Sequence, residues 1–103
     1  MSGFVLHPAA FADLADIWEF IAEGNLDAAD QVVEDIHEAC RSLVATPHQG
    51  YRRSDLTSRP LRFWPVGSYV IAYAPDESPL LIIAVLHGRR SPRVMAALLR
   101  ARE

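Results

Sequence analysis

The chain has 103 residues, of which 50% are apolar and 22% are charged, a composition typical of one small globular domain. Its longest unbroken apolar run, residues 80–86, is too short to cross a bilayer. Residues 1–8 lack the basic and apolar segments of a secretion signal, and the single cysteine, Cys40, cannot form an internal disulfide. We therefore expect a single domain over residues 1–103, a cytoplasmic location and no contact with a membrane.

The two halves of the chain carry opposite charge. Residues 1–50 contain nine acidic residues and one arginine, a net charge of −8, whereas residues 51–103 contain nine arginines and four acidic residues, a net charge of +5. The acidic half is typical of a solvated helical face. The basic half favours an acidic or anionic partner, with ion pairs to the acidic half as the alternative. All ten cationic residues are arginine, which excludes lysine as a general base or Schiff-base nucleophile.

The first half of the chain predicts one strand followed by two helices. An apolar run over residues 4–7 predicts a short strand that ends at a proline. Residues 8–23 repeat apolar side chains at helical spacing and predict an amphipathic helix. Asn25 is a favourable N-cap for a second helix that runs to Thr46. Helices joined this closely pack as an antiparallel hairpin.

The second half predicts a sheet and a short final helix. After a loop rich in glycine, proline and arginine, three strands and a helix are predicted over residues 61–64, 69–74, 80–87 and 93–102. The third of these strands is almost entirely apolar, so we expect it to be central and covered on both faces. The order is β-α-α-β-β-β-α. The predicted fold class is α+β, with a helical hairpin packed on a small antiparallel sheet.

Several short strings occur together in the order found in one known family. They are Leu6-x-Pro8-Ala9-Ala10, Asp13-Leu14-x-Asp16-Ile17-Trp18, Pro47-x-x-Gly50-x-Arg52, Tyr69-x-Ile71-x-Tyr73 and Val85-Leu86-His87-Gly88-Arg89-Arg90. On these strings nearly the whole chain resembles the ParE/RelE superfamily, toxins of type II toxin–antitoxin systems, and most closely its ParE-like members. The resemblance implies neutralisation by a cognate ParD-like antitoxin of the ribbon-helix-helix class. Its C-terminal segment would wrap over apolar surface of the toxin in a toxin–antitoxin hetero-oligomer of higher order.

Different branches of this superfamily imply two different activities. Members similar to ParE inhibit DNA gyrase, whereas members similar to RelE cut messenger RNA on the ribosome. Cleavage needs groups that activate the ribose hydroxyl, stabilise the developing charge and protonate the leaving oxygen, and the candidates here are Arg52, Arg62, Tyr69, His87 and Arg89. Residues 91–103 contain no Tyr, His or Lys, so this set is incomplete. We therefore favour gyrase inhibition by protein contact, without a catalytic residue; the alternatives are an mRNA endoribonuclease and a non-toxic partner-binding module.

Two groups of residues are candidates for contact with partners. Large apolar side chains carry much of the affinity of protein interfaces, and the candidate anchors for the antitoxin are Phe11, Leu14, Trp18, Ile21 and Phe63. For the tryptophan, a place in the core is the alternative. The candidate target-binding residues are arginines near the C-terminus, Arg89, Arg90, Arg93 and Arg100. We expect the residues after Pro92 to be needed for toxicity but not for folding of the strands.

No sequence pattern indicates a metal or a nucleotide cofactor. The four histidines, His7, His37, His48 and His87, lack the spacing of metal ligands, and no glycine-rich phosphate loop occurs. Cys40 lies on the apolar stripe of the second helix, where a small buried core residue is expected. We expect no metal, no cofactor and no sequence-specific DNA binding by this chain. The expected partners are the antitoxin and DNA gyrase.

Overall fold

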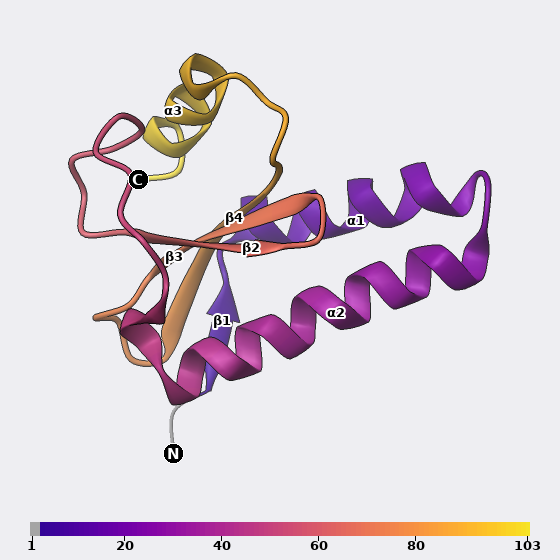
Figure 1. The fold of residues 1–103 in the computed structure, drawn as a ribbon, viewed down its shortest axis with the longest axis horizontal. Helices are drawn as coiled ribbons and strands as arrows, with labels where there is room; N and C mark the ends of the chain where they lie inside the picture. The colour runs from indigo at the N-terminus through magenta and orange to yellow at the C-terminus, as the bar shows by residue number, and fades with distance from the viewer. Residues whose placement is uncertain (1–2) are drawn as a thin grey trace.

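The computed structural model describes residues 3–103 and shows the strands and α-helices in the predicted order (Figure 1). Their bounds agree with the predicted ranges to within two residues. No helix of the described chain is long and apolar enough to cross a membrane. The elements are β1 (Phe4–Leu6), α1 (Pro8–Ala22), α2 (Leu26–Ala45), the 3-10 helix η1 (Pro47–Gln49), β2 (Arg62–Val66), β3 (Tyr69–Ala74), β4 (Leu80–His87) and α3 (Pro92–Arg100).

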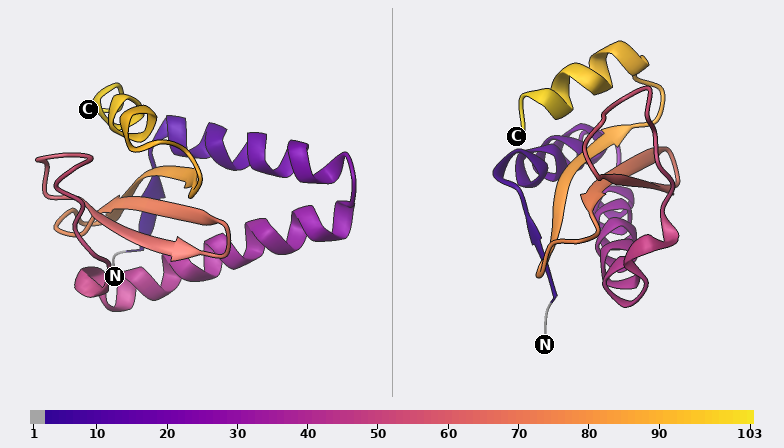
Figure 2. Two further views of the ribbon diagram at one scale, coloured as in Figure 1. Left: turned by 45° about the horizontal axis from the view of Figure 1, so that its top comes forward. Right: turned by 90° about the vertical axis from the view of Figure 1, so that its left-hand side faces the viewer.

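Helices α1 and α2 form the predicted hairpin, and local sequence determines where each begins. The ring nitrogen Nδ1 of His7 accepts a hydrogen bond from the N–H of Ala9 at 3.0 Å, and Pro8 occupies the first turn of α1. The side chain of Asn25 accepts a hydrogen bond from the N–H of Ala28 at 2.9 Å and caps α2, as predicted. The hairpin extends beyond the sheet at the α1–α2 connection (Figures 1 and 2). Its tip is therefore not covered by the sheet.

The sheet contains four strands in the order β1-β4-β3-β2. Strands β2, β3 and β4 are antiparallel neighbours, whereas β1 pairs with β4 in parallel, with Phe4 opposite Leu80 and Leu6 opposite Ile82. The prediction of an antiparallel sheet is therefore corrected to a mixed sheet. An apolar run predicts a strand but not the direction of the strand beside it. The predicted central position of β4 is confirmed.

Strand β2 extends two residues further than predicted and includes Pro65 and Val66. Proline has no N–H to donate, but β2 is an edge strand, where one side of the backbone needs no partner strand. The turn to β3 is consequently short. Gly67 in this turn has a φ of +58°, a backbone conformation that glycine adopts without steric cost.

Each face of the sheet has its own buried core. On one face, the hairpin packs against strands β3 and β4 through Leu14, Ile36, Leu43, Ile71 and Tyr73. On the other face, the loop after η1 and helix α3 cover the strands through Leu56, Leu61, Phe63, Met95 and Leu99. Helices α2 and α3 therefore lie on opposite sides of the sheet (Figures 1 and 2).

Candidate functional site

An apolar hollow of about 240 Å³ lies between α1, α2 and β1, and we call it the hairpin groove. Phe11 lines this groove, and 67% of its surface is exposed. An exposed aromatic side chain beside an apolar hollow is typical of a protein-binding surface. The residues that line the groove are Leu6, Phe11, Leu14, Ala15, Trp18, Val33 and His37.

Trp18 is half-buried at the hairpin groove and connects the two helices. Its indole N–H donates a hydrogen bond to Oδ1 of Asp30 at 2.8 Å. This bond satisfies the polar atom of the indole and fixes the ring against α2. Trp18 is therefore partly packed within the hairpin and partly available to a partner.

The structure places the five predicted antitoxin anchors at three different positions. Phe11, Leu14 and Trp18 line the hairpin groove. Ile21 lies one turn nearer the hairpin tip, where its carbonyl accepts hydrogen bonds from the connection to α2. Phe63 is 1% exposed in the core on the opposite face of the sheet, so the expectation that it anchors a partner is corrected. Neighbouring residues of a strand face opposite sides, and the sequence alone does not tell which side faces the hairpin.

The hairpin groove also has walls that were not predicted from the sequence. They include Leu6 from β1, and Val33 and His37 from α2. Val33 and His37 are four residues apart and lie on one side of the helix. The ring of Phe4 packs beside that of His37, with centroids 6.2 Å apart. The sequence offered one signal for this wall. Val32 and Val33 are adjacent on α2, and adjacent residues of a helix point in different directions, so both valines cannot face the sheet directly.

Four arginines lie on the C-terminal helix or just before it, and we call them the basic segment: Arg89, Arg90, Arg93 and Arg100. The first two lie in the turn after β4 and the others on α3. All four side chains are exposed, and none forms an ion pair with another residue of the range 3–103. Arg93 and Arg100 are seven residues apart and project from the same side of α3. The basic segment therefore presents uncompensated positive charge to solvent.

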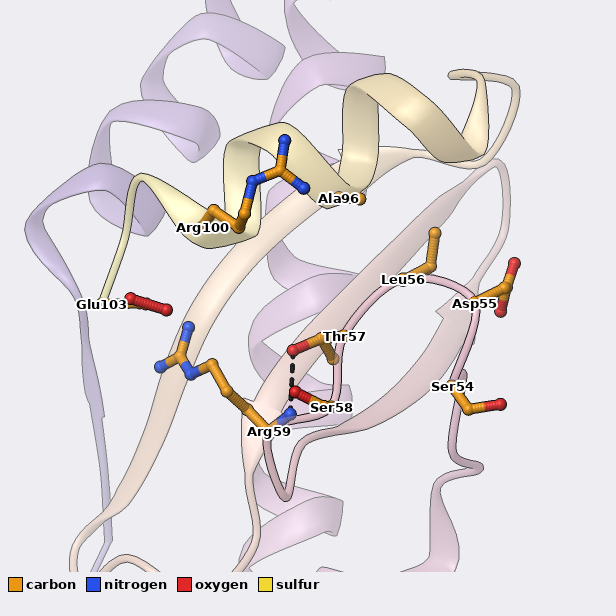
Figure 3. A pocket seen from close by; sticks show the side chains of 9 residues that line it. All are labelled: Ser54, Asp55, Leu56, Thr57, Ser58, Arg59, Ala96, Arg100 and Glu103. Carbon is orange, nitrogen blue, oxygen red and sulfur yellow. Dashed lines mark hydrogen bonds between the residues drawn. The ribbon is translucent and has the colours of Figure 1, made fainter.

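A polar hollow of about 320 Å³ separates the loop over residues 54–59 from the last turn of α3 (Figure 3). The guanidinium of Arg59 donates a hydrogen bond to the carbonyl of Leu99 at 3.2 Å and ties the loop to the helix. Arg100 and Glu103 also line this hollow. The hollow therefore has walls of both charges, but Arg100 and Glu103 form no ion pair with each other.

Asp13 and Arg102 form a mostly buried ion pair that joins α1 to the end of the chain. Two guanidinium nitrogens of Arg102 donate to the two carboxylate oxygens of Asp13 at 2.6 and 2.8 Å. The two side chains are 15% and 11% exposed, respectively, for Asp13 and Arg102. Oδ2 of Asp13 also accepts from the N–H of Val85 at 2.9 Å, and Arg102 donates to the carbonyl of Ile83 at 3.3 Å. We call this group the Asp13–Arg102 clasp.

The clasp takes the place of a missing strand beside β4. Strand β1 ends at Leu6, opposite Ile82, and a register shift leaves Ile83 opposite no residue of β3. Beyond this point the clasp supplies hydrogen-bond partners for backbone groups of β4, which are costly to bury unpaired. As one of the acidic residues of the first half, Asp13 was expected on a solvated face. Its partner lies 89 residues away, so no local pattern indicated the pair.

Helix α3 is consequently part of the fold. Met95 and Leu99 are buried in the second core, and Arg102 belongs to the clasp. The expectation that the strands fold without the residues after Pro92 is therefore corrected. A truncation there would uncover one face of the sheet as well as remove arginines.

The five candidate ribonuclease residues fall into two separate groups. Arg52 and Arg62 line one hollow where β2 begins. Tyr69 and His87 are cross-strand partners at the other end of the sheet, with ring centroids 5.3 Å apart, and Arg89 follows them. Arg62 and Val66, the partner of Tyr69, are four positions apart along β2, about 13 Å at the rise of a strand. The described chain does not bring these residues together around one reacting phosphate.

A buried tyrosine holds the loop after α2 in place. The hydroxyl of Tyr73 donates to the carbonyl of Pro47 at 2.7 Å and accepts from the N–H of Gly50 at 3.0 Å. Burial raises the pKa of this hydroxyl. A Cβ at Gly50 would lie 2.5 Å from the same oxygen, so this position requires glycine. The motif Pro47-x-x-Gly50 therefore has a packing role.

The single cysteine is buried in the core beneath the hairpin. Cys40 is 1% exposed on α2, and burial raises the pKa of its thiol from 9.0 to about 11, which disfavours the reactive thiolate. Over residues 3–103, no three side chains of His, Cys, Asp or Glu are placed to hold a metal ion.

Comparison with known proteins gives both a family and a fold. A family model described as "ParE toxin of type II toxin-antitoxin system, parDE" matches residues 4–92. The chain is similar to a solved structure titled "Chromosomal ParDE TA system from P. aeruginosa", with a TM-score of 0.68 and 20% sequence identity over 84% of this chain and 96% of that chain. No curated protein matches the chain. The predicted ParE-like fold is confirmed by this likeness, and the family model spans the sequence from β1 to the start of α3. The chain belongs to the family of ParE toxins of type II toxin–antitoxin systems.

Proposed function

We propose that this chain is neutralised by a cognate ParD-like antitoxin of the ribbon-helix-helix class, which occupies the hairpin groove. The observation that carries this proposal is the exposure of Phe11, at 67%, beside the apolar walls formed by Leu14 and Trp18. Water is an unfavourable environment for such side chains. An apolar segment of a partner would bury them, and each large apolar side chain fully buried contributes about 1.5–3 kcal/mol.

The charge of the hairpin adds a requirement for this partner. Acidic side chains are exposed along both helices, and the single arginine of this region, Arg41, is already paired with Glu34 and Glu38. An antitoxin segment with Lys or Arg beside its apolar face would complement this negative surface. Toxin and antitoxin would then assemble into a hetero-oligomer of higher order.

Free toxin, in this proposal, inhibits DNA gyrase in the cytoplasm by contact through the basic segment. Arg89, Arg90 and Arg93 are exposed and have no ion-pair partner among the described residues. Unpaired positive charge steers a protein toward a negatively charged complex such as an enzyme bound to DNA. The separation of the candidate ribonuclease residues supports inhibition by contact over RNA cleavage.

Expression of the toxin without its antitoxin tests this proposal, with growth arrest and supercoiling by purified gyrase as readouts. We expect the double variant Arg89→Ala and Arg90→Ala to lose both effects, because it removes two charges from the contact. Arg41→Ala, an exposed arginine of the hairpin, should retain both, and melting curves would verify that each variant folds.

Other outcomes identify the alternatives. Failed supercoiling or trapped DNA breaks with intact messenger RNA would support the gyrase proposal. Messages cut on the ribosome, with activity lost in Arg62→Ala or Tyr69→Phe, would replace it with an mRNA endoribonuclease. Normal growth on expression of folded toxin would leave a non-toxic partner-binding module.

A further inference from the structure

A hollow of about 190 Å³ lies at the end of the sheet where β2 begins. Its charged walls come from four segments: His48 from η1, Arg52 from the following loop, Arg62 from β2, and Asp76 from the turn between β3 and β4. The remaining walls are Pro60, Leu61 and Pro75. None of these residues belongs to the hairpin groove or the basic segment.

Arg52 and Arg62 lie opposite each other in a short antiparallel pairing. Tyr51 and Phe63 exchange two backbone hydrogen bonds, at 2.9 and 2.8 Å. In this register the residue after Tyr51 faces the residue before Phe63, and both arginines line the hollow. Like charges directly opposite each other destabilise a pair of strands. An anion between the two guanidinium groups would relieve this repulsion.

The described residues neutralise only part of this positive charge. Arg52 has no side-chain hydrogen bond or ion pair with any residue of the range 3–103, and Arg62 donates to the carbonyl of Gly50 at 2.8 Å. The single acid that lines the hollow, Asp76, is bonded to Nε2 of His48 at 3.0 Å. With a neutral imidazole, the hollow therefore carries a net charge of +1 from two arginines and one aspartate.

The backbone beside the hollow is held by buried hydrogen bonds. The hydroxyl of Tyr73 bonds to both Pro47 and Gly50, and the carbonyl of Gly50 in turn holds Arg62. This chain of bonds positions the arginine before any ligand arrives. Preorganised donors bind more tightly because less conformational freedom is lost on binding.

We propose that this hollow is an oxyanion site that takes one phosphate group between Arg52 and Arg62. A guanidinium presents parallel N–H groups that match two phosphate oxygens, and a protonated imidazole of His48 would add a donor through Nδ1. The hollow is smaller than the roughly 300–1,000 Å³ pockets of drug-sized ligands. It therefore suits a single phosphate group, either free or carried by a nucleic-acid backbone. The site goes beyond the proposed function, which does not require it.

A titration followed by ¹H–¹⁵N NMR tests the site in the whole chain. One arm adds inorganic phosphate at constant ionic strength, with chloride as the counterpart, and a second arm adds a short DNA duplex. We expect saturable shifts of the amides of Gly50, Tyr51, Arg52 and Arg62. Arg52→Gln should weaken phosphate binding about tenfold, the effect of one lost charge-assisted hydrogen bond. Arg41→Gln removes the same formal charge from an exposed site on α2 that lies outside the hollow and should change the affinity less than about twofold.

The results separate the possible sources of the phosphate and the possible errors. Saturation by inorganic phosphate supports a free phosphate or phosphomonoester, and saturation at these amides by the duplex alone supports a backbone phosphate. Equal weakening by Arg52→Gln and Arg41→Gln would show a general attraction between phosphate and exposed arginines and would overturn the site. So would the absence of saturable shifts at these amides in both arms. Arg52 is exposed and its side chain has no partner among the described residues, and a melting curve of Arg52→Gln would verify its fold.

Discussion

The two layers that cover the sheet differ both in charge and in what they leave exposed. The hairpin layer is acidic and leaves the apolar side chain of Phe11 in an open groove. The layer formed by α3 and the loop after η1 buries Leu56, Leu61, Met95 and Leu99 and exposes arginines. Within residues 3–103, Asp13–Arg102 is the one ion pair that joins the hairpin to the C-terminal segment. Most charges of the two layers are therefore free to meet different partners, and one buried pair holds the layers together.

The largest effect is expected when this connection is broken. Asp13→Ala leaves the guanidinium of Arg102 and the N–H of Val85 without their partner in a mostly buried position. Removing one partner of a buried ion pair costs about 3–5 kcal/mol. The free energy of unfolding, measured by urea denaturation, should fall by this amount. Asp16→Ala, an exposed acid on the same helix, should change it by less than about 0.5 kcal/mol. Equal losses in the two variants would contradict the joining role of the clasp.

A smaller loss of stability is expected at Gly50, where the loop after η1 packs against the sheet. In Gly50→Ala, the added Cβ would lie 2.5 Å from the hydroxyl of Tyr73 and 2.9 Å from the carbonyl of Phe63. Overpacking and weakened hydrogen bonds should together reduce the free energy of unfolding by about 3 kcal/mol. Gly67→Ala is the control: its Cβ meets open space, and only its φ of +58° is unfavourable, a cost of about 1 kcal/mol. A greater loss at Gly67 would show that close approach is not the constraint at Gly50.

The sequence was sufficient for the elements of both layers because their signals are local. Helical spacing, a proline and an asparagine cap indicated α1 and α2, and a nearly continuous apolar run indicated the central strand β4. It was not sufficient for relations between distant segments. The parallel pairing of β1, the burial of Phe63 and the clasp of Asp13 with Arg102 depend on which surfaces meet after folding.

The residues of the candidate site also divide into those predictable from local spacing and those that depend on the packing of distant elements. Phe11, Leu14 and Trp18 share one side of α1 and could be chosen from their spacing. Leu6 and His37 come from other elements and join them only when β1 and α2 pack beside α1. The exposed arginines could be chosen from charge alone. The packed structure was needed to identify which of these arginines lack an ion-pair partner.

Two exposed phenylalanines of α1 can test whether the antitoxin binds at the exposed apolar surface of the hairpin groove. Phe11 and Phe20 are 67% and 75% exposed, but only Phe11 lines the hairpin groove. Phe11→Ala should weaken binding of the antitoxin by about 2 kcal/mol, roughly 30-fold, because a buried aromatic anchor is lost. Phe20→Ala should change the affinity little. Calorimetric titration of each variant with antitoxin provides the measurement, and similar weakening in both would place the interface outside the groove.

The smallest effect concerns the core beneath the hairpin and appears as a dependence of stability on pH. Burial raises the pKa of the Cys40 thiol from 9.0 to about 11. Between these values the unfolded chain releases this proton while the folded chain retains it, so the free energy of unfolding falls as pH rises. The contribution is fully present below pH 9 and is lost as pH approaches 11. At about pH 10 the loss should be about 1 kcal/mol.

Cys40→Ala separates this effect from other titrations. The variant creates a small cavity and is less stable at every pH, but its stability should decline less steeply between about pH 8.5 and pH 10, where an unfolded cysteine titrates. The pKa of Tyr73 is also raised by burial, and its contribution is common to both proteins. The core beneath α3 contains no cysteine, so the difference in slope reports on the hairpin layer alone. Identical slopes in urea denaturation series would indicate that the Cys40 thiol ionises as readily in the folded chain as in the unfolded chain.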